Sequence, residues 1–111
     1  MDYTHKTLAA GRWHSLTMNE QMGNIGSEIS RAMKWKNRNT DLYEKAIFRA
    51  LELVDITLND ARWKNRLKEI ARLREVVCDA FMEGVEYGTT LESLEKYLNP
   101  FAMAARRMVN S

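Results

Sequence analysis

Apolar residues recur along most of this chain at spacings of three and four, the period of an amphipathic helix. The period covers four segments, residues 18–38, 40–58, 61–81 and 91–108. No segment alternates strictly between apolar and polar residues, as a strand would. We therefore predict an all-α fold, an antiparallel up-down four-helix bundle. The last period continues through Pro100, which favours one helix kinked there; a break at Pro100 is the alternative.

Residues with side chains that cap helices stand at the expected starts. Thr17 with Glu20 and Thr89 with Glu92 each have the spacing of a capping box. Asn39 or Thr40 suits the start of the second helix and Asp60 that of the third. Gly84 suits a residue just past the third helix. Residues 1–15 show no strong period, so we expect a loosely structured N-terminal segment before a single domain at 16–109.

Composition narrows the class of protein. The chain has 111 residues, 45% of them hydrophobic, which is ordinary for one globular domain. The net charge of +2 is lower than a dedicated nucleic-acid-binding protein would carry. Cys78 is the only cysteine, which excludes an internal disulfide and suits a reducing compartment. The sequence has no apolar run long enough for a membrane span and no signal-peptide pattern at its start. We expect a cytoplasmic protein with no contact with a membrane.

Three carboxylates are candidates for chemistry or for structure. Glu52 and Asp55 are three residues apart, so they lie on one side of the second predicted helix. Glu28 lies at the edge of the first helix's apolar stripe. Their oxygens could coordinate Mg²⁺. Arg74 falls near the middle of the third helix's apolar face, and a buried guanidinium needs a charged partner. We favour a structural polar network of Arg74 with Glu28, Glu52 and Asp55.

A resemblance supports the metal alternative. The segment Glu52-Leu53-Val54-Asp55 is similar to the Glu-x-x-Asp motif of all-α nucleoside triphosphate pyrophosphatases of the MazG type. In that family a Glu-x-x-Glu pair on an earlier helix completes the metal site. Here the corresponding place reads Ile25-Gly26-Ser27-Glu28, so Ile25 replaces the first glutamate. The likeness spans residues 19–58. It implies a Mg²⁺-dependent nucleotide pyrophosphohydrolase with Glu28, Glu52 and Asp55 as ligands.

A second resemblance covers residues 24–107. The segments 24–28, 49–53 and 73–75 look like those of a family of small all-helical prokaryotic proteins. This likeness implies the helical fold and no particular activity.

Basic residues suggest a third function. Arg62, Lys64 and Arg66 flank Trp63, and basic residues interleaved with aromatic ones suit phosphate contacts and base stacking. In an up-down bundle the end of the fourth helix returns to this region and brings Arg106 and Arg107. These five basic residues are the candidate nucleic-acid-binding set. Catalysis that needs a positioned histidine is not indicated, because both histidines precede the predicted helices.

Other positions point to packing and association. Gly23, Gly26, Ser27 and Ser30 lie within one predicted helix and allow another helix to approach closely. Phe48 and Ile56 interrupt the charged side of the second helix, which indicates an interface between copies. We therefore favour a non-enzymatic helical-bundle protein that acts through self-association, as a homodimer, or through protein partners. It needs no cofactor; Mg²⁺ enters only with the hydrolase alternative, and a nucleic-acid accessory protein is the second alternative.

Overall fold

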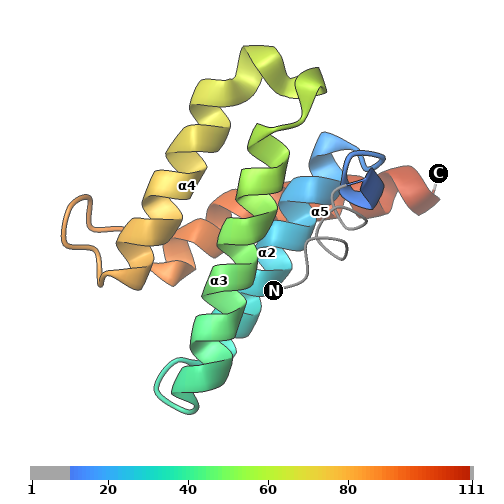
Figure 1. Cartoon of the computed structure of the whole chain (residues 1–111). Helices are drawn as coiled ribbons and strands as arrows, with labels where there is room; N and C mark the ends of the chain where they lie inside the picture. The colour runs from blue at the N-terminus through green and yellow to red at the C-terminus, as the bar shows by residue number, and fades with distance from the viewer. Residues whose placement is uncertain (1–10, 111) are drawn as a thin grey trace.

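The chain folds into helices throughout the part that the structure describes. The structure is a computed structural model and describes residues 11–110 (Figure 1). Residues 11–13 are helical, and the longer elements are α2 (Met18–Trp35), α3 (Thr40–Leu58), the 3₁₀ helix η1 (Ala61–Arg66), α4 (Leu67–Phe81) and α5 (Leu91–Asn110). No strand occurs within residues 11–110. The prediction of an all-α fold is confirmed for these residues.

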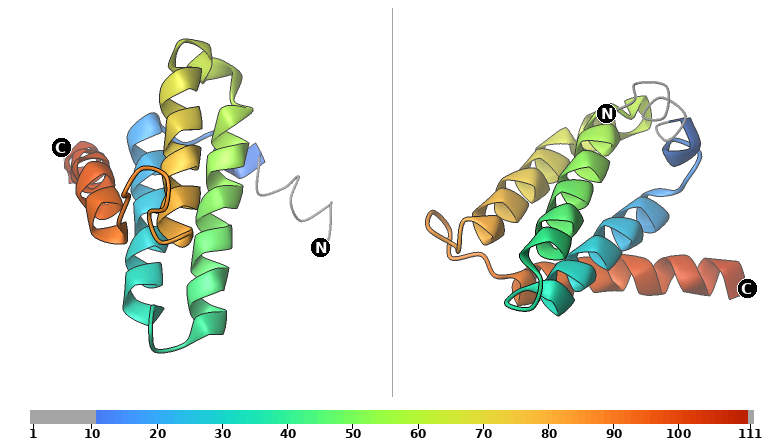
Figure 2. Two further views of the ribbon diagram at one scale, coloured as in Figure 1. Left: turned by 90° about the vertical axis from the view of Figure 1, so that its left-hand side faces the viewer. Right: turned by 60° about the horizontal axis from the view of Figure 1, so that its bottom comes forward.

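Three helices form a layer and the fourth long helix crosses it. α2, α3 and α4 lie next to one another, and the chain turns back at each connection between them (Figure 1). α5 lies across this layer at a steep angle, as Figure 2 shows. α2 packs against both α3 and α5, whereas α4 packs mainly against α3. The predicted four-helix up-down bundle differs from this arrangement in the direction of α5.

Glycines explain where α5 crosses. A Cβ atom at Gly23 would lie 3.0 Å from the Cα of Ala102, and one at Gly26 would lie 3.1 Å from the Cβ of Leu98. The backbones of α2 and α5 therefore approach closely because α2 has no side chain at these positions. The predicted close approach of another helix to Gly23 and Gly26 is confirmed. Pro100 lies inside α5, so the helix continues through it, and the proline ring is exposed. A kink at Pro100 stays a prediction.

Local hydrogen bonds set the helix starts. Thr17 and Glu20 form the predicted capping box, with 2.9 Å from the Thr17 amide to the Glu20 carboxylate. The Asn39 side chain caps α3 by accepting from the Leu42 amide at 3.1 Å. Asp60 caps η1 instead of α4. The backbone is non-helical at Trp63 within η1 (φ −104°, ψ 27°) and again at Arg66 (φ −121°, ψ 13°), the residue before α4.

The second predicted capping box is one residue off. Thr90 replaces Thr89 as the cap of α5: its hydroxyl accepts from the Ser93 amide at 3.1 Å, and the Ser93 hydroxyl accepts from the Thr90 amide. The Thr89 amide, which a capping box would pair with the Glu92 carboxylate, donates to Asp79 at 2.9 Å instead. A long-range carboxylate contact therefore decides this boundary.

The buried core takes residues from the segment before α2 and from α2, α3, α4 and α5. Its members are Trp13, Met18, Met22, Ile25, Ile29, Ala32, Ala46, Ile47, Ala50, Leu53, Val54, Ile70, Leu73, Val77, Ala80, Leu91, Leu94 and Leu98. Trp13 comes from the segment expected to be loosely structured, yet its side chain is only 6% exposed. Burying an indole stabilises the packing of residues 11–16 on α3. The rest of that expectation, for residues 1–10, lies outside the described residues.

Candidate functional site

The three candidate metal ligands do not come together. Glu28 pairs with Arg31 at 2.8 Å and Glu52 with Arg49 at 2.6 Å, each on its own helix. Asp55 pairs with Arg74 at 2.7 Å. Within residues 11–110, no group of three or more His, Cys, Asp or Glu side chains could hold a metal ion. The geometry therefore gives Mg²⁺ coordination by Glu28, Glu52 and Asp55 no support.

The expected polar network reduces to one pair. Arg74 contacts Asp55 and not Glu28 or Glu52, and the two side chains are 44% and 49% exposed. Arg74 lies beside the buried stripe of α4, which runs through Ile70, Leu73 and Val77. The prediction that Arg74 lies in the middle of an apolar face counted Leu67, two turns earlier, as part of that face, but Leu67 is exposed. The pair is therefore an exposed contact between α3 and α4.

Two of the five basic residues proposed for nucleic acid, Arg62 and Arg66, make contacts within the chain. Arg62 donates to Asp60 at 2.7 Å and to the Leu16 carbonyl at 2.7 Å, and its guanidinium lies 4.5 Å from the centre of the Trp63 ring. Arg66 pairs with Glu69 at 2.9 Å.

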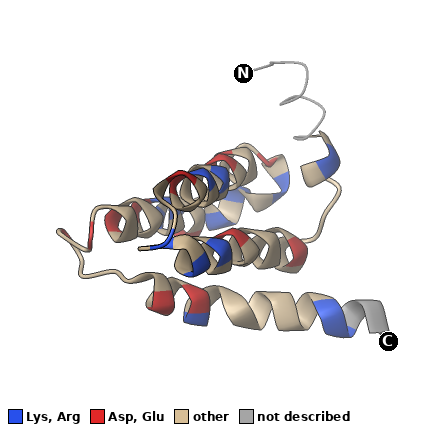
Figure 3. Ribbon diagram, turned by 90° about the horizontal axis from the view of Figure 1, so that it is seen from below, with Lys and Arg blue, Asp and Glu red and all other residues tan. Residues whose placement is uncertain are grey.

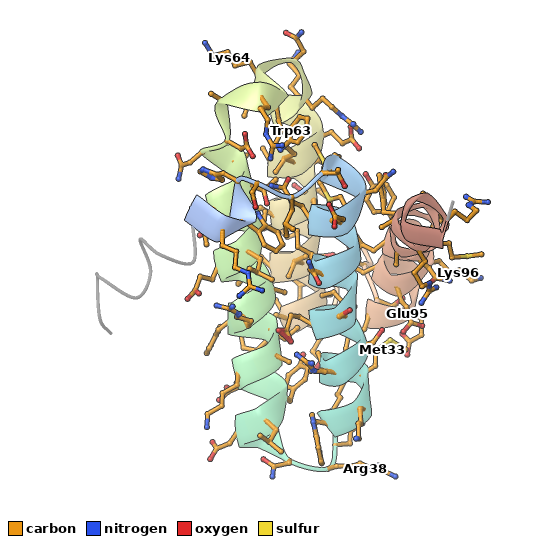
Figure 4. The ribbon with its side chains drawn as sticks, turned by 90° about the vertical axis from the view of Figure 1, so that its right-hand side faces the viewer. Met33, Arg38, Trp63, Lys64, Glu95 and Lys96 are labelled. Atoms are coloured by element: carbon orange, nitrogen blue, oxygen red, sulfur yellow. The ribbon has the colours of Figure 1, made fainter. Side chains whose placement is uncertain are left out.

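Lys64, Arg106 and Arg107 are exposed, the first on η1 and the other two on α5. Lys64 lies at one end of the α2–α3–α4 layer, as Figure 4 shows. Arg62 and Arg66 are thus committed to carboxylates, and the five-residue set does not form one free basic surface.

A buried polar cluster that the sequence analysis missed fastens one end of the molecule. The Gln21 side-chain amide donates to the Trp13 carbonyl at 3.0 Å and to Asp60 at 3.2 Å, and its oxygen accepts from the Trp63 indole at 2.9 Å. The Trp13 indole donates to the Thr57 hydroxyl at 2.8 Å. The cluster ties residues 11–16 to α2, α3 and η1.

A signal for this cluster was present in the sequence. Gln21 is a polar residue within the apolar stripe of Met18, Met22 and Ile25.

The Arg62 hydrogen bonds outweigh burial and hold the pKa of the Asp60 carboxyl well below its usual range. Asp60 therefore stays ionised in the cluster at neutral pH.

A second cluster holds the connection between α4 and α5. The buried Asp79 carboxylate accepts from the amides of Glu86 at 2.9 Å, Tyr87 at 3.2 Å and Thr89 at 2.9 Å. Burial by itself would raise the pKa of Asp79, but the hydrogen bonds from Thr89 and Glu86 outweigh it and lower the pKa. These contacts hold the 82–90 loop in place.

The fixed loop displays apolar side chains. Met82, Val85 and Tyr87 are 61%, 79% and 50% exposed. Two grooves adjoin the loop: one of about 390 Å³ beside Cys78, Met82 and Val85, and one of about 310 Å³ between α4 and α5. The Arg72 guanidinium lies 4.2 Å from the centre of the Tyr87 ring. Arg72 lines the α4–α5 groove and Tyr87 lines the other, so this stack stands between the two.

Phe48 and Ile56, the expected interface residues, lie apart. Phe48 is exposed and packs its ring against that of Phe81, with 5.6 Å between the ring centres. Ile56 is partly buried and lines a different hollow, a cleft of about 700 Å³ between α2 and α3. The two residues therefore do not form one patch.

Comparison with models of protein families, with curated protein sequences and with solved structures found no match. The two family resemblances therefore stay predictions. None of the described helices combines the length and the apolar content needed to cross a membrane.

Proposed function

We propose that this chain is a cytoplasmic, non-enzymatic interaction module that self-associates as a homodimer. Its docking surface consists of the 82–90 loop and the two grooves beside it. The observation that carries this proposal is a loop pinned by the Asp79 carboxylate that nevertheless exposes Met82, Val85 and Tyr87. Exposed apolar residues that share one surface mark interaction sites more often than isolated ones do. Because the loop is fixed, docking it orders few groups and loses little conformational entropy.

The shape of the docking surface suits a second copy of this chain. Val85 projects beside a groove, so each copy would present both a protruding apolar residue and a hollow that can receive one. A two-fold dimer uses the same surface patch on both copies, and that patch must complement itself. Ridge and groove on one patch meet this condition.

The charges on the docking surface also favour a protein partner that presents both acidic and basic residues. The grooves are lined by Arg72 and Arg74 and by Glu69, Glu75 and Glu86, so both signs are present. Figure 3 shows acidic and basic residues interspersed along the helices, and an uncharged stretch in the middle of α5. A phosphate backbone would meet carboxylates here, whereas a second copy offers each charge an opposite one.

The test compares Val85→Asp with Met103→Asp by size-exclusion chromatography with light scattering over a range of concentrations. Both residues are exposed, so neither change removes core packing, but Met103 lies on α5 outside both grooves. We expect the wild type and Met103→Asp to form dimers and Val85→Asp to remain monomeric. A wild type that stays monomeric at all concentrations would overturn the proposal. Dissociation by Met103→Asp alone would move the interface to α5.

A further inference from the structure

A second hollow, separate from the docking surface, opens between α2 and α3. This α2–α3 cleft has a volume of about 700 Å³ and shares no lining residue with either groove of the docking surface. Residues 12–16 cross α3 on the way to α2 and close one side of it (Figure 4). Its described lining residues are Arg12, Trp13, Leu16, Asn24, Ser27, Glu28, Arg31, Arg49, Leu53 and Ile56.

Three arginines from three elements line this cleft. Arg12 comes from the segment before α2, Arg31 from α2 and Arg49 from α3. Glu28 is the one carboxylate among the described lining residues, so their formal charge is +2. Arginines at a concave surface that excludes part of the solvent attract anions more strongly than they would on an open face.

Salt bridges hold two of these arginines in place without using up their donors. Arg31 donates through Nη1 to Glu28 at 2.8 Å, and Arg49 donates through Nη1 to Glu52 at 2.6 Å. Each guanidinium carries five N–H donors, and its planar fork matches the oxygens of a carboxylate or a phosphate. The Glu28 side chain is mostly buried, whereas that of Arg31 is 66% exposed, so its remaining donors face the solvent.

Part of the lining is apolar. Trp13, Leu16, Leu53 and Ile56 contribute to it. The Trp13 side chain is fixed by the hydrogen bond from its indole to Thr57, and its backbone carbonyl accepts from Gln21. A cleft with fixed cations on one part and an apolar, aromatic wall on another is suited to a ligand with both characters.

We propose that the α2–α3 cleft binds a small organic anion that bears a phosphate or a carboxylate on an aromatic body. Arg31 and Arg49 bind the anionic group, and the body packs against Trp13 and its apolar neighbours. This site is independent of self-association, because its residues lie outside the docking surface.

The binding test uses phenyl phosphate, benzoate and neutral benzyl alcohol with the full chain. The three indole N–H signals in an NMR spectrum report on Trp13, Trp35 and Trp63, and only Trp13 lines the cleft. We expect phenyl phosphate or benzoate to shift the Trp13 signal in a saturable manner, and benzyl alcohol to bind at least about tenfold more weakly. The stronger of the two anions identifies the anionic group. Equal binding of benzyl alcohol, or a Trp13 signal that none of the probes moves, would overturn the proposal.

Charge variants locate the site. The double variant Arg31→Gln/Arg49→Gln removes two exposed guanidinium groups, and the control Arg38→Gln removes one in the turn between α2 and α3, outside the cleft (Figure 4). We expect the double variant to weaken anion binding about tenfold or more and the control to leave it unchanged. Equal affinity in both variants would show that the arginines of the cleft do not bind the anion. Far-UV circular dichroism confirms that each variant is folded.

Discussion

At the scale of single residues, Gln21 makes three side-chain hydrogen bonds from a fully buried position. Its side chain serves the Trp13 carbonyl, Asp60 and the Trp63 indole. Gln21→Met keeps the volume but leaves the Trp63 N–H without a partner, while the Trp13 carbonyl keeps the Leu16 amide at 3.1 Å. A buried polar group without a partner costs about 1–3 kcal/mol, so we expect the free energy of unfolding in urea to fall by about 2 kcal/mol or more. Asn24→Met, an exposed change on the same helix, should stay within about 0.5 kcal/mol of wild type.

Arg74 shows how a residue's environment can differ from its place on a helical wheel. Removing one partner of a buried ion pair lowers the free energy of unfolding by about 3–5 kcal/mol. The Arg74 and Asp55 side chains, however, are close to half exposed. Exposed ion pairs contribute about 0–1 kcal/mol because water and salt screen them. We expect Arg74→Ala to lower the free energy of unfolding by no more than about 1 kcal/mol. A loss above about 3 kcal/mol in thermal or urea unfolding would contradict the exposed pair.

At the scale of elements, contact between α2 and α5 depends on the absence of side chains. Alanine is favoured over glycine in a helix by about 1 kcal/mol, but a Cβ at Gly23 would lie 3.0 Å from the backbone of Ala102. Overpacking typically costs about 1–3 kcal/mol. We therefore expect Gly23→Ala to destabilise the protein in urea unfolding, whereas Asn24→Ala, exposed on the same helix, should stabilise it slightly. Stabilisation by Gly23→Ala would mean that α5 can move away without loss.

The helix boundaries could be predicted from the sequence where nearby residues set them. The caps at Thr17 and Asn39 depend on residues three positions ahead; Thr17 was correctly placed, and Asn39 was one of the two residues predicted for its cap. The start of α5 was misplaced because Asp79, ten residues before Thr89, takes the Thr89 amide. The separate turn η1 was missed because it depends on Asp60 and on the non-helical backbone at Trp63. The Asp79 contact decides the cap of α5 and the local backbone conformation decides η1, and the apolar period predicts neither.

At the scale of the whole molecule, the same limit applied to the candidate sites. The sequence places Glu28, Glu52 and Asp55 on the right helices and names Arg74 as a partner, which holds for Asp55 alone. Glu28 and Glu52 pair instead with Arg31 and Arg49. Neither the α2–α3 cleft nor the docking surface was predicted from the sequence. The α2–α3 cleft depends on where residues 12–16 cross α3, and the docking surface on how Asp79 folds the 82–90 loop.

Two carboxylates fasten the two parts of the molecule that we propose to be functional, and acid should release both. Hydrogen bonds lower the pKa of Asp60 and of Asp79 in the folded protein. The unfolded value is about 3.9, so their contribution to stability is present above that pH and is lost as the pH falls towards the lower folded pKa values. We expect the free energy of unfolding to fall steadily below about pH 4.

Amide variants show which carboxylates carry this acid dependence. Asp60→Asn and Asp79→Asn cannot lose a charge at these positions, so each should be less stable than wild type at neutral pH and less sensitive to acid. Asp41→Asn is the matched control, because Asp41 is exposed in the first turn of α3. Urea unfolding measured from neutral pH down to about pH 3 tests the comparison. An acid slope that is the same in wild type, Asp60→Asn and Asp79→Asn would show that neither carboxylate holds its end of the fold through its charge.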